Sequence, residues 1–195
     1  ILRGVTLDEV AGIGDALHEA GIRIVEVPLN SPEPFRSIAS LAARFRDRMV
    51  VGAGTVLDEE SVDRVKSAGG QISVSPDCNE RVIARAVERG LVPLPGVFTP
   101  TEAFTALRAG ARHLKLFPAE AASPKTVKAW KAVLPREAKV YAVGGVTPAN
   151  MREWAATGCA GFGIGSNIYK PGMSPQDVGK AARDFVAAWT ELRGT

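Results

Sequence analysis

The sequence has few residues of the types that build metal centres and disulfide frameworks. Its 195 residues include only two cysteines, Cys78 and Cys159, and only two histidines, His18 and His113. Two distant cysteines are too few for a disulfide scaffold or a structural zinc site, and the histidines lack a metal-binding spacing. We therefore expect two free thiols in a reducing cytoplasm, and neither a metal ion nor another cofactor.

Long apolar runs and clusters of positive charge are also missing. No apolar run approaches the ~20 residues that a membrane helix needs, and no secretory signal is recognisable. The net charge is only +3, and the basic residues are spread out except for Arg44, Arg46 and Arg48, whose alternation suits one solvated helix end. We expect neither a membrane nor a nucleic-acid partner, because basic stripes and aromatic platforms are absent.

Short apolar runs instead recur at regular intervals along the sequence. The runs start about 20 to 27 residues apart, which leaves room in each interval for one strand, one helix and two short loops. They are Ile1–Arg3, Ile22–Pro28, Met49–Gly54, Gln71–Ser75, Leu91–Leu94, Arg112–Phe117, Lys139–Val143 and Ala160–Ile164. Eight such units predict an α/β fold, a closed (β/α)8 TIM barrel forming a single domain over residues 1–195, with an open doubly wound sheet as the alternative.

Helix-start signals fill the intervals between these runs. Thr6 and Glu9 form a capping-box pattern, and several Ser-Pro or Thr-Pro pairs place a hydroxyl at the N-cap and proline at the first helical position. These pairs are Ser31–Pro32, Thr99–Pro100, Ser123–Pro124 and Thr147–Pro148. Because the chain starts directly on a strand-like run, we expect the natural chain to begin upstream, with an N-terminal helix trimmed from this sequence.

A lysine lies within the sixth run, Arg112–Phe117. Strand alternation directs Leu114 and Leu116 towards the helices, and therefore His113, Lys115 and Phe117 towards the barrel interior. Burial disfavours a charged amine, and a neutral amine is the form that attacks a carbonyl to form a Schiff base. The alternative is a structural lysine whose stem is buried and whose ammonium reaches solvent or a carboxylate.

A glutamate lies on the corresponding face of the second run. Alternation places Ile24, Glu26, Pro28 and Asn30 inside the barrel, with Val25 and its alternates outside. An amine that attacks a ketone and a carboxyl group that transfers protons are the two groups that carbinolamine chemistry requires. A buried Lys–Glu ion pair that only joins two strands is the alternative.

Two further polar residues end apolar runs. Arg3 ends the first run, and a guanidinium at that rim suits a carboxylate or a phosphate. Thr55 follows Gly52-Ala53-Gly54, where missing side chains allow another group to approach the backbone closely. Thr55 could donate to a substrate carboxylate, although a solvated arginine and an ordinary strand-ending threonine are equally simple interpretations.

Glycines follow the seventh and eighth runs, as Gly144-Gly145 and Gly165-Ser166. We expect each turn to lead into a helix N-terminus, where amide groups and the helix dipole favour an anion. TIM barrels commonly bind phosphate in these two loops. Simple tight turns are the alternative, and neither loop has a dinucleotide or Walker pattern.

Taken together and in this order, the motifs resemble the 2-keto-3-deoxy-6-phosphogluconate (KDPG) aldolase family, and more closely its 2-dehydro-3-deoxy-6-phosphogalactonate (KDPGal) branch. The resemblance covers essentially the whole chain. The matching segments are Glu26–Pro32, Gly52–Leu57, Pro95–Gly96, Lys115–Pro118, Val143–Pro148 and Gly165–Ser166.

The resemblance implies a cytoplasmic class I aldolase that needs no metal, assembles as a homotrimer and takes a phosphorylated 2-keto-3-deoxy sugar acid. It assigns the Schiff base to Lys115 and proton transfer to Glu26. The products would be pyruvate and D-glyceraldehyde 3-phosphate. It assigns substrate binding to Arg3, Thr55, Asn30, Gly144, Gly145, Gly165 and Ser166.

Three positions bear on the branch. Gluconate-type enzymes resemble Glu-Val-Thr-Leu-Arg and carry threonine before Gly-Gly, whereas this chain has Pro28, Asn30 and Val143. The differences favour the galactonate substrate and shift the carboxylate role towards Arg3. The gluconate epimer, or both epimers, remain alternative substrates.

Two functions from other classes are also compatible with parts of the pattern. A barrel phosphosugar isomerase or phosphate-dependent synthase would explain the glycine loops but leaves an interior lysine without a purpose. A non-catalytic sugar-phosphate-binding barrel would need no interior Lys–Glu pair. Both predict that Lys115 forms no covalent adduct with pyruvate.

Overall fold

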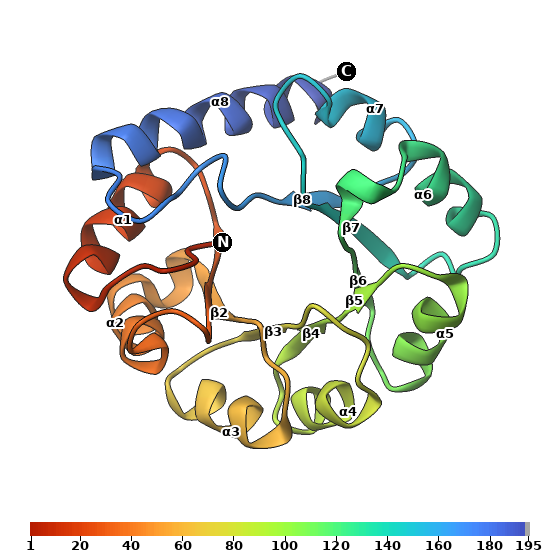
Figure 1. Cartoon of the computed structure of the whole chain (residues 1–195), viewed down its shortest axis with the longest axis horizontal. Helices are drawn as coiled ribbons and strands as arrows, with labels where there is room; N and C mark the ends of the chain where they lie inside the picture. The colour runs from red at the N-terminus through yellow and green to blue at the C-terminus, as the bar shows by residue number, and fades with distance from the viewer. Residues whose placement is uncertain (194–195) are drawn as a thin grey trace.

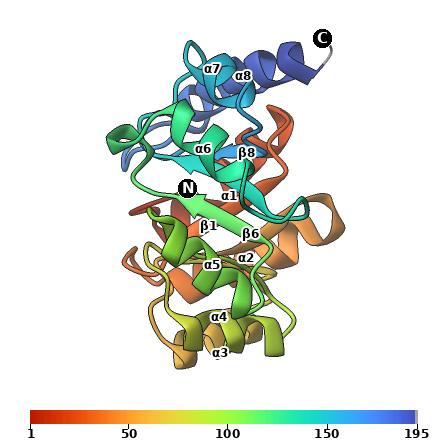
Figure 2. The same ribbon diagram turned by 90° about the vertical axis from the view of Figure 1, so that its right-hand side faces the viewer.

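A computed structural model describes residues 1–193 of the chain, and in it the helices form a ring around parallel strands (Figures 1 and 2). The α-helices are α1 (Leu7–Glu19), α2 (Pro34–Phe45), α3 (Glu59–Ser67), α4 (Glu80–Glu88), α5 (Pro100–Arg108), α6 (Pro124–Lys131), α7 (Met151–Ala155) and α8 (Pro175–Arg193). Two 3-10 turns, η1 (Arg46–Arg48) and η2 (Ala119–Ala121), complete the helical segments. Within residues 1–193, no helix has both the length and the apolar character needed to cross a membrane.

The strands pair in parallel in two groups of four, in the orders β1-β2-β3-β4 and β5-β6-β7-β8. Their bounds are β1 (Ile24–Pro28), β2 (Val50–Gly54), β3 (Ile72–Val74), β4 (Val92–Leu94), β5 (Gly96–Val97), β6 (His113–Leu116), β7 (Lys139–Val143) and β8 (Gly161–Gly163). All pairs are parallel because each helix returns the chain to the same end of the barrel. The predicted (β/α)8 barrel is therefore confirmed, and the open sheet is excluded.

Hydrogen bonds outside the regular strands join the two four-stranded groups and close the barrel at two places. Strands β4 and β5 are one stave interrupted at Pro95, whose carbonyl accepts a hydrogen bond from the Lys115 amide of β6 at 2.9 Å. On the other side, the Leu2 amide donates to the Glu26 carbonyl of β1, and the Ile1 amino group donates to the Ile164 carbonyl beyond β8, both at 2.9 Å. Residues 1–3 thus occupy the first stave.

The prediction that Ile1–Arg3 is a strand is wrong in detail. The segment makes one backbone hydrogen bond to β1 and one to the residue after β8, which is too few for a strand ladder. Leu2 is nevertheless fully buried in the core. A second correction concerns Ile24, predicted to lie inside the barrel. Ile24 is 61% exposed, because it occupies the first position of β1, outside the closed part of the sheet.

Helix starts follow the local sequence at most positions. Thr6–Glu9 forms the predicted capping box, and the predicted N-caps Thr99 and Ser123 precede α5 and α6, each with proline in the first turn. Two predicted starts are wrong. Helix α2 begins at Pro34 after Glu33, and α7 begins at Met151 after Asn150, because turns occupy the Ser31–Pro32 and Thr147–Pro148 segments.

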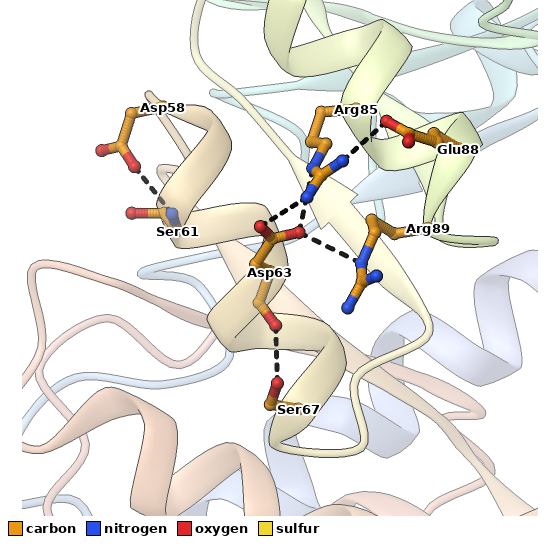
Figure 3. Close-up of polar contacts among 7 residues, drawn as sticks. All are labelled: Asp58, Ser61, Asp63, Ser67, Arg85, Glu88 and Arg89. Atoms are coloured by element: carbon orange, nitrogen blue, oxygen red, sulfur yellow. Dashed lines mark hydrogen bonds and ion pairs between the residues drawn. The ribbon is translucent and has the colours of Figure 1, made fainter.

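The outer faces of α3 and α4 are joined by ion pairs (Figure 3). Asp63 of α3 accepts two hydrogen bonds from the Arg85 guanidinium of α4, at 3.0 and 2.7 Å, and one contact from Arg89 at 3.1 Å. Glu88 holds the other edge of Arg85 at 2.7 Å. All four side chains are partly exposed, so screening by water keeps the energetic contribution of each pair small.

Candidate active site

Two charged side chains are buried inside the barrel. Among the charged residues of the described chain, only Glu26 and Lys115 are buried, with 8% and 7% of their surfaces exposed. Glu26 comes from β1 and Lys115 from β6, which belong to different four-stranded groups of the barrel. Enclosing two charges costs free energy that surface placement would avoid, so their location calls for a chemical reason.

Lys115 lies in the middle of β6, paired in register with Tyr141 of β7. Its neighbours Leu114 and Leu116 are fully buried on the opposite face, as strand alternation predicts. Burial lowers the pKa of the Lys115 amine, Glu26 partly opposes this shift, and the positive charge of Arg3 adds to it. The Nζ atom lies 4.5 Å from the centre of the Phe117 ring. The neutral, nucleophilic amine is therefore more populated than in an exposed lysine.

Glu26 depends on a glycine of the neighbouring strand. A Cβ atom added to Gly54 would lie 1.4 Å from Oε2 of Glu26, so any larger residue would displace the carboxyl group. The Oε2 atom is buried and has no hydrogen-bond partner. Burial raises the pKa of Glu26, while the N-terminal amino group, Lys115 and Arg3 oppose the rise. A carboxyl group with a raised pKa can both donate and accept protons near neutral pH.

Lys115 and Glu26 are near enough to influence each other's pKa but form no ion pair within 4.0 Å in residues 1–193. A purely structural pair would place its charges in contact and satisfy their remaining hydrogen bonds. Here Oε2 of Glu26 is left without a partner. The geometry favours two separate reactive groups, Lys115 and Glu26, over an ion pair that only joins β1 and β6.

Arg3 lies at the rim next to the loop that follows β1. Its Nη1 atom donates a hydrogen bond of 2.6 Å to Oδ1 of Asn30. The backbone reinforces this contact, because the Gly4 amide donates to Oγ of Ser31 at 2.9 Å. The guanidinium is thereby oriented and keeps further N–H groups for an anion.

Thr55 follows β2 with a backbone φ of 56°, in the left-handed region. A β-branched residue rarely adopts this conformation, and such strain persists only where the surroundings enforce it. Hydrogen bonds on both sides do so here. The Gly54 carbonyl accepts from the Leu29 amide at 2.8 Å, and the Val56 amide donates to the Val74 carbonyl at 3.1 Å. Strain of this kind clusters at functional sites.

The glycine loops lie at the ends of two paired strands. Val143 of β7 pairs with Gly163 of β8, so both loops start at the same height in the barrel. Gly144 and Gly145 have φ values of 106° and 68°, which glycine adopts without strain. The carbonyl of Gly145 is held by Nδ2 of Asn150 at 3.0 Å, and that of Gly165 by the Ile168 amide at 2.9 Å.

The predicted helix N-termini after these loops are wrong. Helix α7 begins at Met151 and has only five residues, and the Gly165-Ser166 loop continues into a turn over 166–168, with α8 starting at Pro175. A helix dipole therefore contributes little. Any anion held here would be bound by loop amide groups and by the Ser166 hydroxyl, arranged by the glycine turns.

Of the nine predicted site residues, Glu26 and Lys115 lie within β1 and β6, inside the barrel, and the other seven lie at or beyond the carboxyl-terminal ends of the staves. His113, at the start of β6, is half-buried, and its Nδ1 atom lies 3.0 Å from the Tyr141 hydroxyl. The sequence did not reveal that Gly54 makes room for Glu26, nor that Asn150 and Asn167 support the glycine loops. Only the Gly-x-Gly pattern signalled a close approach at Gly54, and no pattern marked the asparagines.

Comparison with known proteins points in the same direction as this geometry. The family model for KDPG and KHG aldolase matches residues 1–183. The chain is 47% identical over 191 residues to 2-dehydro-3-deoxy-6-phosphogalactonate aldolase of Escherichia coli K12, covering 98% of this chain and 93% of that protein.

Solved structures agree in fold. A structure of native KDPGal superposes with a TM-score of 0.97 at 46% identity, covering all of this chain and 94% of the other. KDPG aldolase of Legionella pneumophila, with pyruvate captured as a covalent carbinolamine, gives a TM-score of 0.82 at 26% identity, covering 94% and 90%. The galactonate-type structure is thus more similar than this gluconate-type structure.

Proposed function

The chain belongs to the KDPG and KHG aldolase family, and from that premise we propose that residues 1–195 form one barrel domain that reversibly cleaves 2-dehydro-3-deoxy-6-phosphogalactonate to pyruvate and D-glyceraldehyde 3-phosphate. The enzyme is a class I aldehyde-lyase, in which Lys115 forms the Schiff base and Glu26 transfers protons. The greater similarity to galactonate-type relatives favours this substrate over the gluconate epimer.

One observation carries the assignment of roles. The chain buries a single lysine and a single carboxylate among the described charged residues, in one interior, without joining them in an ion pair. Burial moves both pKa values towards neutrality, downwards for the Lys115 amine and upwards for the Glu26 carboxyl group. Schiff-base chemistry requires both shifts, because it uses a neutral amine and a group that alternates between acid and base.

The first half of the reaction forms the electron sink. The lone pair of Lys115 Nζ attacks C2 of the 2-keto acid, giving a carbinolamine. Glu26 donates a proton to the departing C2 hydroxyl, water leaves, and an iminium ion links the substrate to Lys115. A cation at this position is stabilised by the nearby carboxylate and by the Phe117 ring, 4.5 Å from Nζ.

The second half breaks the carbon–carbon bond. Loss of the C4 hydroxyl proton, which the Glu26 carboxylate accepts, lets the C3–C4 electron pair move into the iminium. D-Glyceraldehyde 3-phosphate departs, and an enamine remains on Lys115. Protonation of C3 followed by water attack on the iminium releases pyruvate and restores the free amine.

The two ends of the substrate have separate anchors. Arg3, oriented by Asn30 at 2.6 Å, and Thr55 bind the C1 carboxylate. The loops with Gly144, Gly145, Gly165 and Ser166 bind the 6-phosphate. Binding energy from this remote phosphate orients C2 towards Lys115 and lowers the entropic barrier to attack.

Reductive trapping tests the covalent step. The protein is incubated with pyruvate, reduced with borohydride, and analysed by intact and peptide mass spectrometry. We expect the mass of one reduced pyruvate on the peptide that contains Lys115. A matched pair of variants, Lys115→Met and Lys131→Met, separates position from chemistry, because the Lys131 amine instead donates to the Ala138 carbonyl at 3.1 Å.

The adduct should disappear in Lys115→Met and persist in Lys131→Met. An unmodified wild-type protein would refute the aldolase assignment and would favour a non-covalent isomerase, a synthase or a sugar-phosphate-binding barrel. Pyruvate release from the two C4 epimers of the substrate then measures the preference between branches. The family resemblance also supports a cytoplasmic homotrimer, and light scattering of the purified protein tests the subunit number.

A further inference from the structure

Asn167 lies directly after the Gly165-Ser166 loop and reaches across to the other glycine loop. Its Nδ2 atom donates a hydrogen bond of 2.8 Å to the carbonyl of Val146, which follows Gly144-Gly145. The two residues are separated by 21 positions in the chain and belong to different β/α units. This side-chain bond therefore joins the two loops near the tips that follow β7 and β8.

The Gly144-Gly145 loop has a second support of the same kind. Oδ1 of Asn150 accepts a hydrogen bond of 2.9 Å from the Thr147 amide, and Nδ2 of Asn150 donates one of 3.0 Å to the Gly145 carbonyl. Two successive carbonyls, those of Gly145 and Val146, are therefore bound by asparagine amides from two directions. Asn150 shapes the loop from within its own unit, whereas Asn167 sets its position relative to the neighbouring loop.

The stability of the fold does not explain the Asn167 contact. Asn167 is exposed, and an exposed amide group can exchange a protein carbonyl for water with little net loss. The fixed geometry matters instead to a ligand that touches both loops at once. Gly144 and Gly145 have positive φ values and gain no rigidity from side chains, so an unclamped loop would lose more conformational entropy on binding.

We infer that Asn167 is a positioning residue that clamps the two phosphate-binding loops at the spacing required by the 6-phosphate of the substrate. The inference rests on the proposed function, since that function supplies a ligand with a phosphate at this end. Asn167 acts through the loops and takes no part in the Schiff-base chemistry. Its loss should weaken binding of the phosphorylated end and spare the reactions of pyruvate at Lys115.

The test compares Asn167→Ala with Asn79→Ala in the full-length protein. Asn79 caps α4, far along the chain from the glycine loops, so its replacement controls for loss of a hydrogen-bonding asparagine. Steady-state cleavage of the phosphorylated 2-keto acid gives KM and kcat. Deuterium exchange of the pyruvate methyl group, followed by NMR in heavy water, reports the Schiff-base end alone.

We expect Asn167→Ala to raise KM for the phosphorylated substrate by about three- to tenfold, because the unclamped loop must then be ordered when the substrate binds. Competitive inhibition by inorganic phosphate should weaken by a similar factor. Pyruvate exchange should keep its wild-type rate. Asn167→Asp, which preserves shape but cannot donate to the Val146 carbonyl, should show at least the same rise and guards against misfolding of the alanine variant.

An unchanged KM in both Asn167 variants would overturn the inference, as would an equal loss of pyruvate exchange, which would indicate a general structural role. Failure of the proposed function looks different. In that case the wild-type protein itself neither exchanges the pyruvate methyl protons nor forms the borohydride-stable adduct.

Discussion

Two groups of charged residues in this molecule follow opposite rules. On the outer faces of α3 and α4, four partly exposed side chains are joined by hydrogen bonds and ion pairs of 2.7 to 3.1 Å (Figure 3): Asp63, Arg85, Glu88 and Arg89. Inside the barrel, Lys115 and Glu26 are buried and do not pair, and Oε2 of Glu26 lacks any partner.

The exposed group on α3 and α4 is compatible with a stable fold, whereas burying Lys115 and Glu26 lowers the free energy of unfolding. The outer group satisfies its own hydrogen bonds and lowers the pKa of Asp63 through the Arg85 contact. The inner pair shifts in the opposite sense, because burial dominates: the pKa of Glu26 rises and that of Lys115 falls. Buried charges with shifted pKa values cluster at functional sites, which supports the roles proposed for this pair.

Removing the buried carboxylate of Glu26 should have the largest effect on activity. Glu26→Gln keeps the shape of the side chain but cannot transfer protons. We expect kcat to fall by about 10² to 10⁴-fold, the usual contribution of general acid–base catalysis. Stopped-flow or coupled assays of pyruvate release measure the change. Full activity of a correctly folded Glu26→Gln protein would refute the catalytic role of this residue.

A slightly smaller effect should follow from displacing the same carboxylate. In Gly54→Ala the added Cβ would collide with Oε2 of Glu26 at 1.4 Å, so the carboxyl group must move. A misplacement of about 1 Å can reduce the rate by about 10²-fold. Gly12→Ala is the matched control, because its added Cβ would make only an ordinary contact of 3.4 Å with Pro175. Equal kcat values in the two variants would contradict the predicted displacement.

The cost of burying Lys115 should appear in the pH dependence of stability. Its pKa is lowered in the folded state, so the unfolded chain binds this proton more tightly than the folded chain. The cost is therefore present below the folded pKa and vanishes above the ordinary value of 10.5. Urea unfolding should show Lys115→Met more stable than wild type at neutral pH, with the advantage shrinking as the pH rises through the lysine range.

Lys131→Met is the control for the change in stability caused by replacing any lysine with methionine. The Lys131 amine lies outside the barrel interior pair and donates to the Ala138 carbonyl. If the advantage of Lys115→Met grew with pH, the assigned direction of the pKa shift would be wrong.

The smallest effect is expected in the outer group. Asp63→Asn removes the carboxylate that Arg85 and Arg89 share, but solvent screens these exposed charges. We expect the melting temperature to fall by less than about 4 °C, with kcat unchanged. Calorimetry with and without added salt checks the result. A large loss of activity would show that this surface is coupled to the barrel interior, and would blur the distinction between the two groups.

Much of the barrel could be predicted because its signals are local. Apolar runs and the Thr6–Glu9 capping box depend only on neighbouring residues, and the capping box forms as the sequence predicts. The failures have a cause outside the local sequence. Ser31–Pro32 and Thr147–Pro148 carry helix-start chemistry but form turns, because the residues after them must first connect the rim to the outer ring.

The site was partly predictable for the same reason. Period-two alternation within β6 and β1 was enough to place Lys115 and Glu26 inside the barrel, since side-chain direction in a strand is decided residue by residue. Only the tertiary structure could decide what surrounds them. The space that Gly54 leaves for Glu26, the Arg3–Asn30 bond and the Asn167–Val146 clamp join residues 21 to 28 positions apart. Contacts of this kind arise from closure of the barrel, and no short stretch of sequence encodes them.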